Sequence, residues 1–496
     1  MSARYVVLSM LDFTSHPFGG IGKLEPPQEK NSNGTPTEPH LFFYGMLVPV
    51  TPTALIQRAG VPPKDLQKWN SILQAIYGGA TLAISPAAGL FMDRMGSRRT
   101  PFLLCLVCLT GATALLAVGT NIGLWVAGRL LQGVSAGVLW VVCLALLTDT
   151  VGPAGIGQAV GVIGIPMSIG PIVGPLLGGV IYAHGGYYAV FGLMFAMLGV
   201  DAVLRLVMIE KRVAQKWLEA EAVQSDIPDV RPESDSPVSL TPCPESSDTS
   251  YTMTGNDDER TNGAPPSSQI LHYQLPPILR LLLSFRMLVG LAGGLLQSCL
   301  NVALDSTLPL VVNALFGWQQ TGQGLIFITI LLPSLLQPVF GAITDRYQQG
   351  RRLLAAGGCL LATPAYVLLR LVTEDTLSQK TLLCVLLVII GLAMAIAMPA
   401  IIAEIGATVA DAEKNDPQAV KGSVIATGWS LVNAAYAAGC LIGPLFAGLI
   451  RNAAGWQTTT WCLGLLSAVT GVFLLLCLGG WVGKLRPKAF VHRVPR

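Results

Sequence analysis

Long apolar runs alternate with short polar stretches along most of this chain. A helix needs roughly 20 apolar residues to cross a hydrocarbon layer about 30 Å thick, and it satisfies its own backbone groups there. The runs therefore predict an all-α polytopic membrane protein with about 12 transmembrane helices. Six spans are expected at residues 41–58, 70–91, 101–120, 122–147, 159–182 and 187–208. Six more are expected at residues 287–311, 323–344, 353–372, 381–404, 423–450 and 458–481.

A polar segment, residues 212–276, separates the two sets of spans and is crowded with Ser, Pro, Asp, Glu, Thr and Asn. So few apolar residues cannot offset the entropy lost on ordering, and we expect a disordered cytosolic linker. It divides the chain into an N-terminal half at 41–211 and a C-terminal half at 277–482, followed by a cytosolic tail at 483–496.

The amino-terminal segment, residues 1–40, is atypical. An apolar piece at residues 5–14 resembles the start of a first span, but a polar insert at residues 16–40 separates it from the apolar run that follows. No lipid-exposed helix tolerates such an insert. Either the first span is short, near residues 41–57, or the insert is an artefact of the gene model, and we favour the artefact.

Basic residues gather in short loops after the second and eighth spans and in the tail. They are Arg94, Arg98, Arg99, Arg346, Arg351, Arg352, Lys484, Arg486, Lys488, Arg493 and Arg496. The positive-inside rule places these loops, both termini and the linker in the cytosol. Arg58, Lys64 and Lys68 fall in the first external loop and oppose this assignment.

Composition supports the membrane interpretation. The 496 residues are 52% hydrophobic and only 12% charged, whereas charged residues make up about 25% of soluble globular proteins. A net charge of +3, with its basic residues scattered, excludes a nucleic-acid surface. The ten cysteines lack metal-site or disulfide spacing, and no G-x-S-x-G pattern occurs. We therefore expect no metal, no cofactor and no enzyme activity.

One pattern, G-x-x-x-D-R, recurs at matching places in the two halves. Its residues are Gly89, Asp93 and Arg94 after the second span, and Gly341, Asp345 and Arg346 after the eighth. An internal repeat at the level of spans is typical of transporters that rock two halves about a midplane site. The glycines allow close helix approach, and the charges can pair with a neighbouring helix end in one conformation. We expect these residues to gate conformational change, although charges here can also serve only to fix topology.

With this loop motif the chain resembles the major facilitator superfamily. The fourth span adds Arg129-Leu130-Leu131-Gln132-Gly133, similar to the R-x-x-Q-G pattern of that family. A bare arginine at this depth is costly, which marks it as functional. The resemblance implies a major facilitator fold of two pseudo-symmetric six-helix halves, and a role for Arg129 in proton handling.

A third motif, in the fifth span, bears on the direction of transport. It comprises Gly161, Gly170, Gly174, Pro175, Gly178 and Gly179, and it is echoed in the eleventh span by Gly439, Gly443 and Pro444. Glycines on one face with a proline give a tightly packed, kinked helix that can hinge or seal a cavity. The motif resembles that of the superfamily's drug:proton antiporters, and nearly the whole chain is similar to fungal twelve-span antiporters related to the vesicular amine transporters. The resemblance implies efflux.

Two acidic residues lie inside apolar spans. Asp305 in the seventh span and Glu404 at the end of the tenth are costly as anions where water is scarce. With Arg129, we expect them to be proton-coupling residues. Asp201 and Arg205 stand one helical turn apart and are expected to form a structural pair.

The sequence says less about the transported molecule than about the fold. Amine transporters of this kind have an acidic residue in the first span, and here only Asp12 is near, beyond the polar insert. The cavity candidates suit a mid-sized neutral or weakly charged compound instead. They are Tyr44, Gln74, Trp140, Gln297, Asn301, Asn433 and Tyr436.

We therefore expect a monomeric, proton-coupled exporter of a secondary metabolite or toxicant, with protons, a small-molecule substrate and the lipid bilayer as partners. The plasma membrane is the expected location, with a vacuolar or vesicular membrane as the alternative. Two other functions stay open at this point. They are a proton-coupled uptake symporter and a non-transporting membrane receptor built on the same fold.

Overall fold

The helices of the computed structural model follow the apolar runs of the sequence. The structure describes residues 39–94, 99–151, 156–207, 281–347, 350–414 and 423–479, and these contain no strand. All of them belong to one unit, Pro36–Arg496, while Met1–Thr35 is a second unit outside the described residues. The polar insert, Asp12, the expected linker and the tail also lie outside them.

In the described residues, the N-terminal half contains five α-helices and one short 3-10 helix. They are α2 (Pro39–Gln57), η1 (Pro63–Asp65), α3 (Leu66–Arg94), α4 (Arg99–Val118), α5 (Ile122–Val151) and α6 (Ile156–Val207). Helix α6 covers two predicted spans, and its two parts meet at Gly186. The φ angle there is 75°, a conformation that glycine adopts without steric cost.

The C-terminal half repeats this arrangement. Its elements are α10 (Phe285–Phe316), α11 (Gln320–Leu331), η3 (Leu332–Leu336), α12 (Gln337–Arg346), α13 (Arg351–Leu368), η5 (Leu369–Leu371), α14 (Leu377–Lys414) and α15 (Ser423–Cys477). Helix α15 also contains two helices, which meet at Gly455 with a φ angle of 81°. The eighth predicted span is interrupted by η3, which has a proline at its start and so lacks a backbone donor there.

Helices occupy all twelve positions at which the sequence predicts a span. Among the described residues, eight helices are long and apolar enough to cross a membrane, with α6 and α15 each counted once. The helix α2 is represented by a shorter apolar stretch, Phe42–Gln57. The all-helical polytopic architecture is thus confirmed, and the count of twelve crossings stays a prediction.

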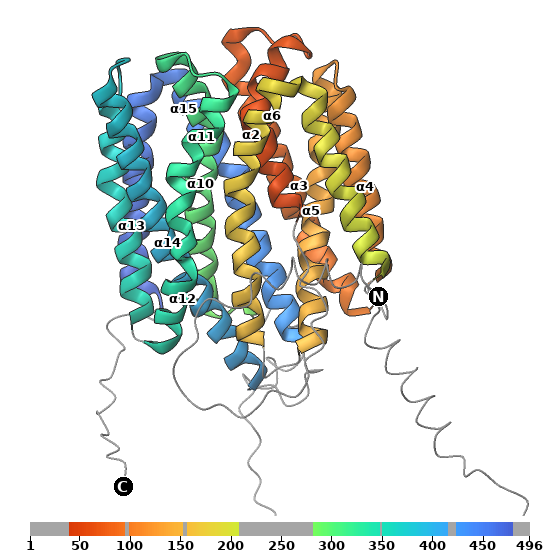
Figure 1. The fold of residues 1–496 in the computed structure, drawn as a ribbon. Coiled ribbons are helices and arrows are strands. Elements are labelled where there is room, and N and C mark those ends of the chain that lie inside the picture. Colours follow the sequence, from red (N-terminus) through yellow and green to blue (C-terminus); the bar gives the residue numbers. More distant parts are fainter. Residues whose placement is uncertain are drawn as a thin grey trace, which may run out of the picture. The chain divides into compact units, whose positions relative to one another are not determined.

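Each half has its own apolar core. One cluster of buried side chains draws only on residues between Phe42 and Leu198, in α2 to α6. Two further clusters lie between Leu281 and Leu478, with Val48 of α2 the one residue from the other half. The halves meet where α3 packs on α15 and α6 packs on α11 (Figure 1).

A glycine allows close backbone approach in each of these two contacts. A Cβ atom built on Gly78 of α3 would lie 2.5 Å from the backbone nitrogen of Leu441 in α15. A Cβ atom on Gly324 of α11 would meet the carbonyl oxygen of Pro175 in α6. The two interfaces are therefore built alike, with backbone against backbone, as the internal repeat of the sequence predicts.

Candidate functional site

Asp305 lies at the boundary between the halves. The Tyr44 hydroxyl group of α2 donates a hydrogen bond to Asp305 Oδ2 of α10 at 3.5 Å. The Tyr44 ring packs on the Tyr77 ring of α3, with the centroids 5.2 Å apart. No basic side chain pairs with Asp305 among the described residues. A partly buried carboxyl group in one half thus faces a phenol from the other half.

Two side chains of α15 complete this group from the C-terminal half. Tyr436 and Cys440 are hydrogen-bonded to each other one helical turn apart, and both lie within electrostatic range of Asp305. Tyr44 interacts electrostatically with both of them, with Asp305 and with Arg129. We call Tyr44, Tyr77, Arg129, Asp305, Tyr436 and Cys440 the central cluster.

Arg129 contributes a buried cation to the central cluster. It is 1% exposed, and it donates hydrogen bonds to Gln132 Oε1 at 3.1 Å and to Thr51 Oγ1 at 3.3 Å. Its Nε atom has no hydrogen-bond partner, and within the described part of the chain no carboxylate lies at ion-pair distance from it. Neutral partners leave its charge uncompensated, which is expensive in a buried site.

The remaining cavity candidates lie in both halves of the protein. The buried Oε1 of Gln74 in α3 has no hydrogen-bond partner. Gln297 of α10 accepts from Cys359 Sγ at 3.6 Å, inside the C-terminal half. Asn433 of α15 donates to Ser85 Oγ of α3 at 2.8 Å, across the boundary. The two remaining candidates, Trp140 on α5 and Asn301 on α10, are partly buried.

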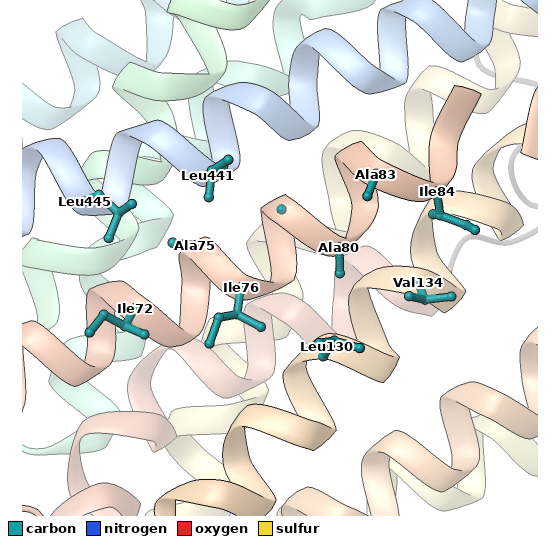
Figure 2. A pocket seen from close by; sticks show the side chains of 11 residues that line it. Ile72, Ala75, Ile76, Ala80, Ala83, Ile84, Leu130, Val134, Leu441 and Leu445 are labelled. Atoms are coloured by element: carbon teal, nitrogen blue, oxygen red, sulfur yellow. The ribbon is translucent and has the colours of Figure 1, made fainter. Parts of the chain in front are cut away.

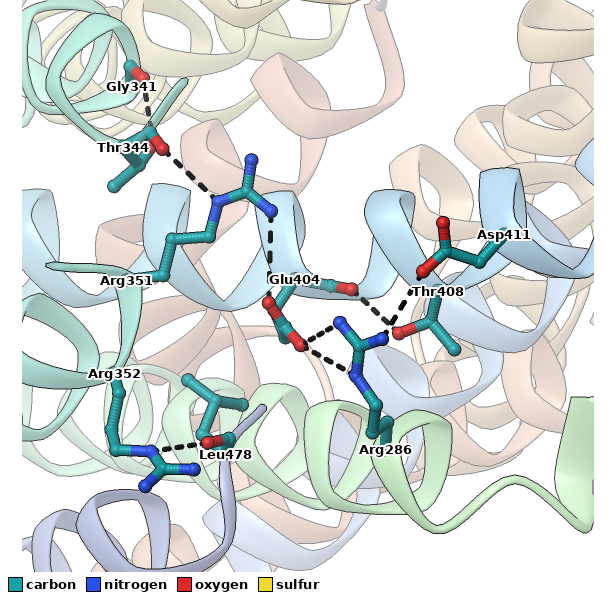
Figure 3. A network of polar contacts seen from close by, with 9 residues as sticks. All are labelled: Arg286, Gly341, Thr344, Arg351, Arg352, Glu404, Thr408, Asp411 and Leu478. Atoms are coloured by element: carbon teal, nitrogen blue, oxygen red, sulfur yellow. Dashed lines mark hydrogen bonds and ion pairs between the residues drawn. The ribbon is translucent and has the colours of Figure 1, made fainter. Parts of the chain in front are cut away.

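Glu404 belongs to a separate network of polar contacts within the C-terminal half (Figure 3). Arg286 of α10 holds Glu404 Oε1 at 2.6 Å, and Arg351 of α13 approaches Glu404 Oε2 at 3.8 Å. Arg351 also donates to the carbonyl oxygen of Thr344 in α12 at 3.1 Å. Arg286 reaches Asp411 Oδ2 at 3.3 Å. Glu404 therefore joins three helices, and Arg286 is a partner that the sequence analysis did not identify.

The two copies of the loop motif are placed differently. At the second span, a Cβ atom on Gly89 would lie 3.0 Å from Ser430 of α15; the side chains of Asp93 and Arg94 lie outside the described part. At the eighth span, Asp345 and Arg346 are exposed at the end of α12, and a Cβ atom on Gly341 would lie 4.0 Å from the Pro399 side chain of α14. The buried basic residue of this loop is Arg351.

The glycine motif of α6 brings backbones together on two sides. A Cβ atom on Gly174 would lie 2.7 Å from the Phe42 carbonyl oxygen of α2, and one on Gly178 would meet the Met46 carbonyl oxygen. A Cβ atom on Gly179 would instead meet the Gln320 carbonyl oxygen of α11, in the other half. The motif thus ties α6 both to its own half and to its neighbour. Gly170 also lies on α6, and Gly161 lies where only the backbone is described.

The echo of this motif in α15 packs in the same way within its half. A Cβ atom on Gly439 would meet Ser298 of α10, and one on Gly443 would lie 2.5 Å from the Cys299 carbonyl oxygen. Pro444 beside them is buried. The relation of α15 to α10 therefore repeats that of α6 to α2.

Polar contacts also cross the boundary at the end of the helices opposite the Glu404 network. Asn70 of α3 donates to the Ser306 carbonyl oxygen of α10 at 2.9 Å, and Gln67 donates to the same oxygen at 3.3 Å. Arg451 of α15 donates to Gln67 Oε1. Gln320 of α11 donates to Thr53 Oγ1 of α2 at 2.6 Å. Polar side chains thus close the boundary between the halves at this end.

The comparison with known families decides the affiliation of the chain. The model of the Major Facilitator Superfamily matches residues 40–426. The chain belongs to this superfamily. An uncharacterized MFS-type transporter of Schizosaccharomyces pombe is 32% identical over 431 residues, covering 86% of this chain and 90% of that protein. With its apolar helices, the chain is a multi-pass membrane protein from a transporter family.

Two further relatives match about a third of this chain. A multidrug resistance protein B homolog of Mycobacterium tuberculosis is 33% identical over 168 residues, covering 33% of this chain and 30% of that protein. A probable vesicular acetylcholine transporter-B of Danio rerio is 28% identical over 173 residues, covering 34% of this chain and 35% of that protein. The resemblance to fungal relatives and to vesicular amine transporters is thereby confirmed.

A solved structure supports the fold. The human organic anion transporter MFSD10 superposes with a TM-score of 0.57 at 18% identity, and the match covers 89% of this chain and 97% of that one. At this identity the likeness shows the major facilitator fold alone.

Proposed function

We propose that this major facilitator protein exports a small organic molecule in exchange for protons, and that Asp305 binds the coupling proton. The observation that carries the proposal is the contact of Asp305 in α10 with Tyr44 in α2. This contact joins the two halves, so a change in the charge of Asp305 acts directly on the boundary that must open and close during transport.

The energetics favour a proton at this position. A carboxylate at the centre of a bilayer-spanning helix costs about 2.5 to 3.5 kcal/mol on insertion scales. No basic partner offsets this cost for Asp305 among the described side chains, and Tyr44 supplies a single long hydrogen bond. Proton binding removes the cost when the cluster is closed to water, and hydration of the anion removes it when the cluster is open. Arg129 is linked to Asp305 through Tyr44, and we propose that it serves as a fixed positive charge beside the proton-binding group.

Export is supported by the glycine motif of α6, which resembles that of drug:proton antiporters, and by the partial likeness to a multidrug resistance protein homolog. The tyrosines of the central cluster favour a mid-sized neutral or weakly charged cargo, because aromatic rings bind such compounds without a matching charge. A secondary metabolite or toxicant fits this class. The plasma membrane is the proposed location, because export from the cell must cross it.

An efflux assay tests direction and energy source together. Cells that express the chain are loaded with the neutral dye Nile red, ATP is clamped, and a protonophore is added. We expect the protonophore to abolish the chain-dependent part of Nile red efflux, since an antiporter draws the energy for export from the proton gradient.

The control is the same strain without the chain, whose efflux is subtracted. Nile red efflux that persists with the protonophore and follows the ATP level would contradict the proposal. Chain-dependent accumulation of the dye inside the cells would contradict export and favour an uptake symporter.

A further inference from the structure

An apolar groove of about 610 Å³ opens on the outer side of the helix bundle, where α3 lies between α5 and α15 (Figure 2). Its lining side chains are all Ile, Leu, Val, Ala or Gly. Small residues of α3, such as Ala80 and Ala83, form the hollow, while Leu130 of α5 and Leu445 of α15 form its sides. This volume lies within the range of small-molecule sites, about 300–1,000 Å³.

Hydrocarbon surrounds this groove when the protein is in a membrane. Leu130 is 50% exposed, and Ile442 and Leu449 on the same side of α15 are 45% and 60% exposed. Residues of the groove also come from the middle part of α3, away from both of its ends. Anything that reaches the groove from outside must therefore be dissolved in the bilayer, and its surface must be apolar, because the groove offers no polar partner.

A single layer of helix separates the groove from the central cluster. On α3, Ile76 lines the groove and its neighbour Tyr77 belongs to the cluster. On α15, Leu441 lines the groove and its neighbour Cys440 belongs to the cluster. The seam between these helices is closed by the contact of Gly78 with Cys440 and Leu441.

The two walls of this seam belong to different halves, α3 to the first and α15 to the second. A rocking motion that separates the halves at Gly78 therefore joins the groove to the central cluster. We propose that the groove binds neutral lipophilic molecules dissolved in the bilayer, and that cargo passes from it to the central cluster through the α3–α15 seam. The passage rests on the proposed export function, whereas binding in the groove does not.

Binding is tested in phosphatidylcholine nanodiscs with Nile red, without a proton gradient. The Ala83→Trp variant fills the groove from an exposed position, and Ala83→Leu is a milder second variant. The control is Ala87→Trp, one turn further along the exposed face of α3 and outside the groove. We expect saturable binding by the parent and by Ala87→Trp, and a Kd roughly tenfold higher or no saturable binding for Ala83→Trp.

Nile red efflux from cells tests the passage with the same variants. We expect slower initial efflux for Ala83→Trp and Ala83→Leu and parental efflux for Ala87→Trp. No saturable binding by the parent, which means that only bilayer acyl chains fill the groove, would overturn the proposal. Equal binding by the Ala83 variants and Ala87→Trp would also overturn it. Parental efflux by a variant that has lost binding would remove the groove from the cargo path, while proton coupling would remain intact.

Discussion

The contact between Tyr44 and Asp305 joins the two halves through a single pair of side chains. At 3.5 Å the distance between the two oxygen atoms is longer than in a normal O–H···O hydrogen bond, so this weak contact does not hold the Asp305 side chain firmly. Arg129, by contrast, is fixed by Gln132 and by Thr51. The Thr51 hydroxyl group donates to the Leu47 carbonyl oxygen at 2.7 Å, which leaves its lone pairs for the arginine. Within the central cluster, the Asp305 side chain is therefore weakly held, whereas the Arg129 side chain is fixed by its hydrogen bonds.

Glu404 offers a prediction at the residue scale. The Glu404→Gln variant leaves Arg286 and Arg351 without their shared carboxylate. Glu404 is 7% exposed and Arg286 is 38% exposed, so we expect a loss of about 1.5 to 3 kcal/mol, the range for hydrogen bonds to charged groups. Thermal unfolding of the purified protein in detergent measures it as a lower Tm.

The matched control is Asp411→Asn, which removes the other carboxylate that Arg286 contacts. Asp411 is 56% exposed, and exposed ion pairs contribute about 1 kcal/mol or less. A Tm for Glu404→Gln no lower than that for Asp411→Asn would contradict the structural role. Loss of proton-driven transport in Glu404→Gln at unchanged Tm would support the proton-coupling role that the sequence predicts for Glu404.

Residue-scale reasoning from the sequence selected Asp305 and Arg129 because charged groups are costly in an apolar span, and it selected Tyr44 and Tyr436 as aromatic cavity candidates. It missed Tyr77 and Cys440, since a tyrosine or cysteine among apolar residues is ordinary packing. It also missed Arg286, which lies at the start of a span, where a basic residue usually only sets topology. The meeting of these side chains depends on how the halves pack, which no local pattern contains.

At the scale of elements, the spacing of glycines decides how closely the helices approach. In the Gly178→Ala variant the added methyl group meets the Met46 carbonyl oxygen of α2. Backbone atoms cannot rotate away as a flexible side chain can, so we expect a destabilisation of about 1 to 3 kcal/mol from overpacking. Thermal unfolding in detergent is again the measurement.

Gly192 in the second part of α6 is the control. A Cβ atom there has no neighbour within 4 Å, and alanine restricts the unfolded chain more than glycine does. We expect Gly192→Ala to be neutral or stabilising by up to about 1 kcal/mol. Equal Tm values for Gly178→Ala and Gly192→Ala would show that α6 and α2 are less tightly packed than the structure indicates.

The sequence predicted the elements well, because apolar length decides where a helix can cross a bilayer. The seventh predicted span, at 287–311, became α10 at Phe285–Phe316, and the added residues include the polar Arg286 and Asn313. The interruption at η3 was not predicted, although Pro333 and Pro338 inside the eighth span are a signal for it.

Arg58, whose positive charge opposed the predicted topology, stacks on Tyr187 with its guanidinium carbon 4.4 Å from the ring centroid. It therefore has a structural reason to be there.

At the scale of the whole molecule, the account rests on two halves that move against each other. Polar contacts such as Asn70 with the Ser306 carbonyl oxygen close one end of the boundary. The Gly78 and Gly324 contacts are backbone against backbone, so they can slide without breaking strong bonds. Asp305 and Tyr44 join the two halves, and under the proposed function they link protonation to this motion.

Proton release from reconstituted vesicles tests the central claim most directly. Proteoliposomes are loaded with acid buffer and the trapped pH dye pyranine, and Nile red is added outside. We expect the parent to release protons on addition of the dye and Asp305→Asn to release none beyond protein-free vesicles. Asp375→Asn, at an exposed site in the loop before α14, is expected to behave as the parent does. Equal proton release by Asp305→Asn and the parent would contradict the assignment of Asp305, and no release by the parent would contradict proton exchange altogether.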